Sequence, residues 1–291
     1  MAGYEPWKNP EDFVFHYTST SGLIGILNSQ TIWFTNAGFL NDTEELAYGA
    51  NVAAEKLREC ARHEQSIQPD DPKTDYVVYA LKSIAESLEH ISGGNSIGVD
   101  FPFVSCFSTE RDDLSQWRGY ASGGCCIAFH RDSLGSSMIP VGGILGFGKN
   151  IPMLEDVEYG AKASGIIDEH ISLLVSHLRD RGPGAAPEGI VNYYLIKQVL
   201  LPGIIRIKHP AFFKESEVRM YAIEPGDVIF RPSDLGPVPY MAVKFEKNAV
   251  AEVIAAPGEH QSRRVRAAEA LLSACGFYSV QASRSFAPFA G

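Results

Sequence analysis

Apolar and polar side chains recur along the chain with two different periods. A period of two, typical of a strand, marks 13–18 (F-V-F-H-Y-T) and the charged part of 212–223 (F-F-K-E-S-E-V-R-M-Y-A-I). Spacings of three and four, typical of an amphipathic helix, mark 43–57, 76–92 and 263–275. Apolar runs between turn residues predict further strands at 31–35, 103–107, 125–129, 156–159, 240–245, 250–255 and 279–282, and further helices at 21–28, 166–178 and 191–201.

These elements predict an α+β fold, in which a mixed, largely antiparallel sheet forms the core and helices flank it. A length of 291 residues suits one large domain or two small ones, and with no internal repeat evident we expect a single domain over 1–291. Two polar stretches interrupt the patterns. Residues 63–75 are predicted to form a solvated loop, and 179–188 (R-D-R-G-P-G-A-A-P-E) a flexible insertion.

The stretch 104–129 predicts a compact unit of strand, short polar helix, glycine turn and strand. Ser108 or Thr109 is the expected N-cap of the helix, because a hydroxyl can accept from a backbone N–H of the first turn. Leu114, Trp117 and Tyr120 follow at three-residue spacing and are expected to share the face that packs on the strands. Ser115 and Arg118 then point elsewhere.

Composition excludes several classes of protein. A formal net charge of -10 argues against a protein that coats nucleic acid, which needs many cationic side chains to neutralise phosphates. The five cysteines include the adjacent pair Cys125 and Cys126 but show no zinc-ligand spacing, so we expect reduced thiols and no metal. The N-terminus lacks the pattern of a signal peptide, and no apolar run of about 18 residues occurs. We therefore expect a soluble, cytoplasmic protein without a membrane partner.

His16 is the first candidate for chemistry, because a strand-borne imidazole can bond a ribose hydroxyl or act as a base. The alternative is a half-buried histidine that bonds the backbone. Thr18 would share its strand face, and two polar groups that face a core must both find partners.

Two carboxylates, Glu215 and Glu217, form the second candidate. On one strand face they repel unless one is paired, protonated or exposed, and Arg219 is placed to pair with Glu217. One interpretation is an edge-strand ion pair. The other is a carboxylate that stabilises a developing oxocarbenium ion, and in that case Glu217→Gln should leave folding nearly unchanged while turnover falls.

A weaker candidate is the turn after the polar helix, where Arg118 and the backbone N–H groups of 122–124 could hold an anion. The motifs of P-loop enzymes, zinc proteases and α/β-hydrolases do not occur. The glycines of 142–148 do not form a dinucleotide-binding fingerprint after a strand.

Four blocks in this order resemble a large bacterial family that is catalogued only as a numbered domain of unknown function. They are F-H-Y-T at 15–18, F-L-N-D-x-x-E at 39–45, C-F-S-x-x-x-D-D-L-x-Q-W-x-x-Y at 106–120 and F-K-E-S-E-V-R at 213–219. The resemblance spans most of the chain. Members often end in a serine, an apolar-proline pair and an arginine, whereas this chain ends S-F-A-P-F-A-G, which lacks that arginine.

More remotely, the layout is similar to that of His-Tyr-Glu ADP-ribosyltransferases, which bind NAD. That resemblance implies an ADP-ribosyltransferase-like fold, with His16 on the NAD ribose, an aromatic from Tyr17, Trp33 or Phe34 on the nicotinamide, and Glu217 supporting the oxocarbenium. The catalytic carboxylates are then Glu217 and Glu215. The residues expected at the NAD site are His16, Tyr17, Thr18, Trp33, Phe34, Asn41, Ser115, Arg118 and Arg219.

The function implied is an NAD-dependent ADP-ribosyltransferase-like enzyme that modifies a macromolecule, protein or nucleic acid, as a toxin or defence effector. One alternative is a non-enzymatic binding or regulatory module of the same fold. Another is a metal-dependent nuclease or hydrolase that uses the carboxylates. An enzyme needs His16, Glu217 and the region of Trp117 around one cleft, whereas a binding module can scatter them.

Overall fold

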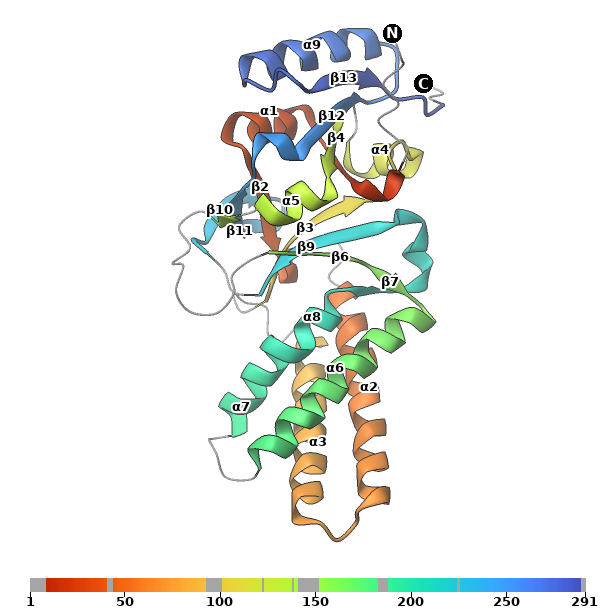
Figure 1. Ribbon diagram of the computed structural model, residues 1–291, viewed down its shortest axis with the longest axis vertical. Helices are drawn as coiled ribbons and strands as arrows, with labels where there is room; N and C mark the ends of the chain where they lie inside the picture. The colour runs from red at the N-terminus through yellow and green to blue at the C-terminus, as the bar shows by residue number, and fades with distance from the viewer. Residues whose placement is uncertain are drawn as a thin grey trace.

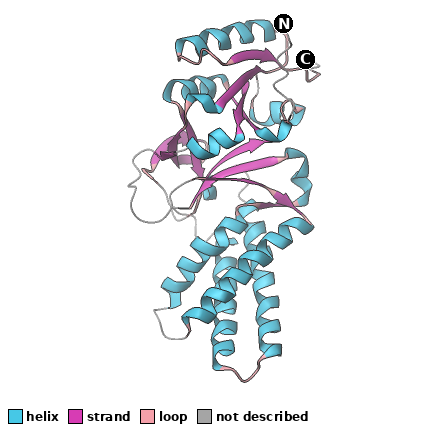
Figure 2. Cartoon of the chain, in the orientation of Figure 1, coloured by secondary structure: helices cyan, strands magenta, loops and turns pink. Residues whose placement is uncertain are grey.

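A computed structural model describes residues 9–40, 44–92, 101–121, 123–137, 139–140, 152–182, 188–223 and 226–288. Figure 1 shows a sheet with helices on it at one end of the molecule and a group of long helices at the other. The long helices are α2 (Glu44–Ile67), α3 (Pro72–Ser92) and α6 (Ala161–Arg181). The shorter α7 (Glu188–Leu195), a π-helical turn (Ile196–Leu200) and α8 (Leu201–Ile204) lie beside them (Figure 2).

Within the described residues, eleven strands form one sheet, whose main path runs β10-β11-β2-β3-β1-β4-β12-β13. The path strands are β1 (Phe13–Thr18), β2 (Thr31–Asn36), β3 (Phe103–Ser108), β4 (Cys125–His130), β10 (Ile229–Ser233), β11 (Gly236–Lys244), β12 (Val250–Ala255) and β13 (Gln281–Arg284). Off the path lie β5 (Ile139–Pro140), β6 (Met153–Asp156) and β9 (Glu217–Ala222). Their described pairings are antiparallel except for β12 with β13, which confirms the predicted α+β fold with a largely antiparallel sheet.

The sheet forks at β3. One edge of β3 pairs with β9 along its whole length, from Phe103 opposite Ala222 to Ser108 opposite Glu217. The other edge is shared, because β2 pairs with Phe103 and Val104 while β1 pairs only at Ser108. In the described register, residues 105–107 have no strand partner on this edge, so β1 and β2 separate there.

The two faces of the sheet pack against different helices. One face packs on α1 (Thr20–Ser29), α5 (Arg131–Ser137) and α9 (Gln261–Ala274) through residues such as Val14, Phe34 and Phe103. On the other face, Val104 and Tyr221 pack on the long helices. A smaller apolar cluster joins β1 to α4 (Leu114–Tyr120) through Phe15, Tyr17 and Trp117.

Short connections place the elements that build the fork. Ser19 caps α1 by accepting from the Gly22 N–H, and the helix ends at Gln30 in the left-handed conformation, so that β2 begins at Thr31. A 3-10 turn (Ala37–Phe39) follows β2. The pair β7 (Glu158–Tyr159) and β8 (Ile207–Lys208) forms a small parallel sheet that leads into the 3-10 helix η4 (Pro210–Glu215).

Several predicted boundaries differ in the structure. The predicted loop 63–75 is mostly helix, since only residues 68–71 separate α2 from α3. The predicted strand over 212–223 begins only at Glu217, because the chain from Pro210 to Glu215 is 3-10 helical. Of the predicted insertion 179–188, the ends belong to α6 and α7, while residues 183–187 lie outside the described residues.

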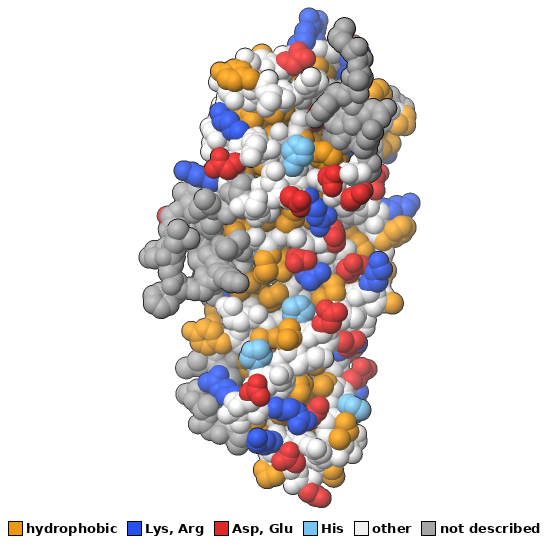
Figure 3. Space-filling model, in the orientation of Figure 1, with side chains coloured by type: hydrophobic (Ala, Val, Ile, Leu, Met, Phe, Trp, Pro, Cys, Tyr) orange, Lys and Arg blue, Asp and Glu red, His pale blue; other side chains and the backbone are white. Residues whose placement is uncertain are grey.

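The helical end of the molecule carries acidic and basic side chains that alternate on the face shown in Figure 3. Ion pairs join its helices, among them Lys56 with Asp168 and Arg179 with Glu64. In the described part of the chain, no helix combines the length and apolarity that crossing a membrane would require.

Candidate functional site

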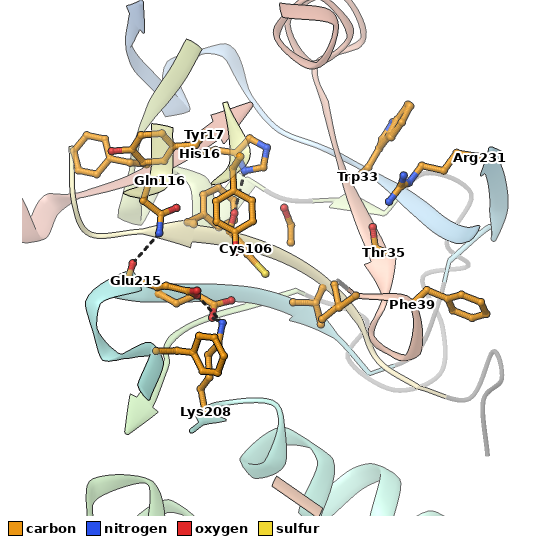
Figure 4. Close-up of a pocket in the computed structure, with 18 residues that line it drawn as sticks. His16, Tyr17, Trp33, Thr35, Phe39, Cys106, Gln116, Lys208, Glu215 and Arg231 are labelled. Carbon is orange, nitrogen blue, oxygen red and sulfur yellow. Dashed lines mark hydrogen bonds and ion pairs between the residues drawn. The ribbon is translucent and has the colours of Figure 1, made fainter. Parts of the chain in front are cut away.

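A pocket of about 420 Å³ opens at the fork of the sheet (Figure 4). A volume of this size lies within the range of small-molecule sites. The strands contribute His16, Trp33, Thr35, Cys106, Lys208, Glu217 and Arg231, and the helical segments contribute Phe39, Gln116, Tyr120, Phe212 and Glu215. His16 and Glu217, which are about 200 positions apart in the chain, therefore line the same pocket, as an enzyme of the expected kind requires.

His16 occupies the gap that the fork leaves beside β3. Its Nδ1 lies 3.0 Å from the carbonyl oxygen of Cys106, which can only accept, so Nδ1 carries a proton and donates. Burial lowers the pKa of His16, and the bond to Cys106 partly opposes this. The neutral ring consequently presents Nε2 as an acceptor. The backbone bond expected of a structural histidine is present, and the ring still borders the pocket.

Glu217 is the centre of a buried network of charges. Arg219 grips it with two hydrogen bonds, Nε to Oε1 at 2.7 Å and Nη2 to Oε2 at 2.9 Å, and Lys208 Nζ lies 3.1 Å from Oε2. Burial raises the pKa of Glu217, but the charge and hydrogen bonds of Arg219, helped by Lys208, outweigh it and lower the pKa to about 2. The predicted pairing of Arg219 with Glu217 is confirmed. It is not on an edge, because β9 lies between β3 and β6.

Glu215 differs from Glu217 in its exposure. Its Oε2 lies 2.6 Å from Lys208 Nζ, yet 23% of its side chain is accessible, against 6% for Glu217. The two carboxylates therefore share one lysine, while only Glu217 has an arginine fixed on both of its oxygens. Of the two, Glu215 is the carboxylate that a ligand in the pocket can reach.

The backbone at Glu215 is held from three directions. Its carbonyl oxygen accepts from Ser108 Oγ at 2.8 Å and from Gln116 Nε2 at 3.5 Å. The next residue, Ser216, turns the chain through the left-handed region with a φ of 45° and accepts from the Thr109 N–H. This corner separates Glu215 from the strand, so its position depends on β3 and α4 as well as on β9.

Helix α4 forms one wall of the pocket. Its N-cap is Asp113, which accepts from the backbone N–H groups of Ser115 and Gln116, and not Ser108 or Thr109 as predicted. Gln116 and Tyr120 are four residues apart and line the pocket together. Tyr120 is therefore half exposed and is not part of the packed face, and partial burial raises its pKa to about 12.

The opposite end of the pocket has a different character. Trp33 is half exposed and packs against Tyr240 with ring centroids 4.4 Å apart. Figure 4 shows Trp33 beside Arg231, on the side of the pocket away from Glu215 and Lys208. The pocket thus has an acidic end with a compensating lysine, an aromatic and cationic end, and His16 between them.

The structure brings together most of the residues predicted from the sequence. His16, Tyr17, Trp33, Glu215 and Glu217 line the pocket, and Arg219 stands behind Glu217. The hydroxyl of Tyr17 is committed elsewhere, since it donates to the Glu110 carbonyl oxygen and accepts from the Asp113 N–H. Tyr17 contributes the side of its ring, not a free hydroxyl.

Other predicted residues lie away from the pocket. Phe34 is fully buried in the core on the opposite face of the sheet, because side chains alternate along β2 and Trp33 takes the pocket side. Thr18 ends β1 opposite Cys125 and lies against α1. Ser115 and Arg118 are exposed on other sides of α4, and Arg118 borders a second pocket near the start of α9. Asn41 lies outside the described residues.

The residues that sequence reasoning missed reach the pocket through tertiary contacts. Lys208 comes from the short strand β8 and Arg231 from β10, and neither carries a local signal. Phe212 follows in η4, and the centroid of its ring lies 4.9 Å from Lys208 Nζ. Gln116 and Tyr120 could have been found from their spacing of four, which places both on one helix face.

Among the described residues, no group of three or more His, Cys, Asp or Glu side chains is arranged to hold a metal ion. Comparison with known proteins finds no matching family model, no matching curated protein and no matching solved structure.

Proposed function

We propose that the chain is an ADP-ribosyltransferase-like enzyme, in sheet architecture and in activity, that cleaves NAD in the pocket at the fork. The observation that carries the proposal is the convergence of His16 from the first strand with Glu215 and Glu217 from a late part of the chain on one pocket. Trp33, Tyr120 and Phe212 supply aromatic surfaces for planar groups around the same space.

The chemistry is a substitution at the ribose carbon C1′. The bond from C1′ to the nicotinamide nitrogen breaks, the electron pair leaves with nicotinamide, and positive charge develops on the ribose. A nucleophile of the acceptor then bonds to C1′ and loses its proton. A carboxylate near C1′ lowers the barrier because its attraction grows as the charge develops.

Glu215 is the better candidate for that carboxylate. The charge of Glu217 is already compensated by Arg219 and Lys208, and both of its oxygens accept hydrogen bonds. Glu215 is more exposed and its Oε1 is outside the pair with Lys208. This differs from the expectation from the sequence, in which Glu217 supports the oxocarbenium ion: here Glu217 holds Lys208 and Arg219 in place, and Glu215 faces the reacting ribose.

The remaining contacts give NAD one orientation in the pocket. Nε2 of His16 accepts from a ribose hydroxyl, and the side chain of Gln116 bonds the nicotinamide amide between Tyr120 and Phe212. At the other end Trp33 stacks on adenine and Arg231 pairs with the diphosphate. A macromolecular acceptor, and with it the toxin or defence role, is part of the same proposal, since Tyr120 and Phe212 line the pocket and keep part of their rings exposed.

A second candidate is a module that binds the nucleotide without cleaving it. The observation in its favour is the complete ion pairing of Glu217, which is the arrangement of a structural carboxylate. Binding and cleavage separate the two candidates. Calorimetric titration with NAD gives the affinity, and chromatography of the reaction mixture gives the nicotinamide released.

We expect NAD binding and nicotinamide release from the parent chain, weaker binding by Trp33→Ala, and slow release by Glu215→Gln. Glu59→Gln on the exposed side of α2 is the matched control, because it removes the same charge far from the pocket. Binding without release in the parent chain would favour the module. If the parent chain shows no binding and no release, NAD is excluded as the ligand.

A further inference from the structure

Residues 285–287, which follow β13 and are called the C-terminal segment below, reach the loop between β3 and α4 and bond Asp112 there. Asp112 Oδ1 accepts from Trp117 Nε1 at 2.6 Å and from Ser285 Oγ at 2.5 Å. Its Oδ2 accepts from the backbone N–H groups of Phe286 at 2.5 Å and Ala287 at 3.0 Å. Hydrogen bonds to a carboxylate are stronger than neutral ones, so these four bonds tie the C-terminal segment to α4.

The C-terminal segment is fixed independently of Asp112. The Ser285 N–H donates to the Ala255 carbonyl oxygen of β12 at 3.1 Å, and Gln261 Nε2 of α9 donates to the Ser285 carbonyl oxygen at 2.9 Å. Ser285 is buried, in contrast to its exposed neighbour Phe286. The C-terminal segment therefore links β12 and α9 to Asp112 and fixes the position of Asp112 relative to the sheet edge.

The neighbouring loop residue grips the same pair of strands. Arg111 Nη2 lies 3.0 Å from Glu252 Oε1 on β12 and 3.1 Å from Ser283 Oγ on β13. Of two consecutive loop residues, Arg111 is thus attached to β12 and β13 and Asp112 to the segment after β13, and Asp113 then begins α4 as its N-cap.

These attachments control a wall of the pocket. Helix α4 is only seven residues long, and a helix of that length is not stable by itself. Trp117 packs edge-on against Tyr17 on one side, while Gln116 and Tyr120 face the pocket on another. The rotation of α4 about its axis, which Trp117 and its bond to Asp112 fix, decides where Gln116 and Tyr120 lie.

We propose that Asp112 is a positioning residue, and that the C-terminal segment holding it is a structural part of the pocket. Loss of the three bonds from Ser285, Phe286 and Ala287 frees the start of α4 while the rest of the fold stays intact. The expected fall in NAD turnover rests on the proposed function. The expected loss of order in α4 does not, so the proposed function and the positioning role of Asp112 can fail separately.

Two shortened chains test the proposal. A chain that ends at Arg284 lacks all three donors, and a chain that ends at Pro288 keeps them and serves as the control. Hydrogen exchange of the amides of α4 should become at least about tenfold faster in the first chain and unchanged in the second, while α2 and α3 exchange alike in both. Asp112→Asn in the full-length chain should act in the same direction.

Kinetics with NAD add a measurement that simple loss of stability would not produce. In the chain ending at Arg284, kcat should fall by about 10- to 100-fold, because misplaced side chains lose their orientation toward the reacting bond. KM should change much less than kcat, because Trp33 and Arg231 at the other end of the pocket still bind the substrate. The acetylated peptide S-F-A-P-F-A-G, added to this chain, should restore part of kcat and of the α4 protection.

Unchanged exchange in α4 of both the shortened chain and Asp112→Asn would overturn the proposal. So would a rise in KM with kcat retained. If the full-length chain releases no nicotinamide, the proposed function fails, and the exchange rates of α4 alone decide whether the C-terminal segment positions it.

Discussion

Glu217→Gln tests the structural role of the buried network of Glu217, Arg219 and Lys208 separately from the catalytic role proposed for Glu215. The substitution keeps the size of the side chain but removes the charge that faces Arg219 and Lys208. It also places an amide N–H₂ where the structure requires an acceptor. Arg219 then loses its paired carboxylate and Lys208 keeps only Glu215, in a site where Glu217 is 6% and Arg219 2% exposed. The sequence-based expectation of nearly unchanged folding is therefore replaced by one of clear destabilisation.

The size of the effect follows from the pKa and from known cases. Lowering the pKa of Glu217 from 4.5 to about 2 corresponds to about 3 kcal/mol of stability near neutral pH. Removing one partner of a buried ion pair costs about 3–5 kcal/mol in other proteins, which agrees in magnitude. For a chain of 291 residues, 3 kcal/mol lowers Tm by about 5 °C.

A thermal melt followed by circular dichroism measures the effect. Glu215→Gln is the matched comparison, because it removes the same charge from a residue only two positions away. Since Glu215 is more exposed, its loss should lower Tm by only about 2 °C or less. A Glu217→Gln variant that melts with the parent would refute the reasoning, since it would show that Arg219 and Lys208 do not depend on this carboxylate.

Three further predictions follow from the same geometry. Because the pKa of Glu217 is lowered in the folded state, the stability that its carboxylate contributes is fully present above pH 4.5 and is lost as the pH falls toward 2. Urea unfolding midpoints measured across this range should show the loss in the parent and not in Glu217→Gln. Trp117→Ala should cost about 3–5 kcal/mol of stability, because it empties a buried site and breaks the bond to Asp112. Trp33→Ala should change the stability by only about 0.5 kcal/mol, because Trp33 is half exposed. Equal losses of the two variants in denaturant titrations would contradict the assignment of Trp117 to the core and Trp33 to the pocket. The double variant Glu217→Met with Arg219→Met should be more stable than Glu217→Met alone, because the single variant keeps a buried guanidinium that has lost its carboxylate; a double-mutant cycle without coupling would argue against the pair.

The local patterns predicted the elements well and the site only in part. Alternation along 13–18 correctly groups Phe13, Phe15 and Tyr17, whose side chains lie in the small apolar cluster, although Phe15 and Tyr17 also line the pocket beside His16. The same rule applied to β2 would have separated Trp33 from Phe34, which the resemblance had treated as equivalent.

Glu215 shows where alternation fails. Pro210 starts a 3-10 helix, and the left-handed Ser216 ends it, so that Glu215 and Glu217 are two apart in sequence but belong to different elements. Helix geometry explains a second difference, since Gln116 and Tyr120 share the pocket face of α4 while Ser115 and Arg118 do not.

Lys208 and Arg231 could not be predicted from local sequence at all. The position of Lys208 depends on how β8 pairs with β7, about 50 residues earlier, and that of Arg231 on how the β10–β11 hairpin pairs with β2, about 200 residues earlier. Side-chain periodicity within a segment carries no information about such pairings. The same holds for Asp112, whose partners Ser285, Phe286 and Ala287 lie more than 170 residues away in the chain.

The central proposal is that Glu215, facing the pocket at the fork of the sheet, supports cleavage of NAD. The most direct test is the initial rate of nicotinamide release by the parent chain, Glu215→Gln and Glu59→Gln, measured at a temperature where all three are folded. We predict release by the parent and by Glu59→Gln at similar rates, and a rate about 10²–10³ lower for Glu215→Gln. Equal rates for all three chains, or no release by the parent, would contradict the proposal.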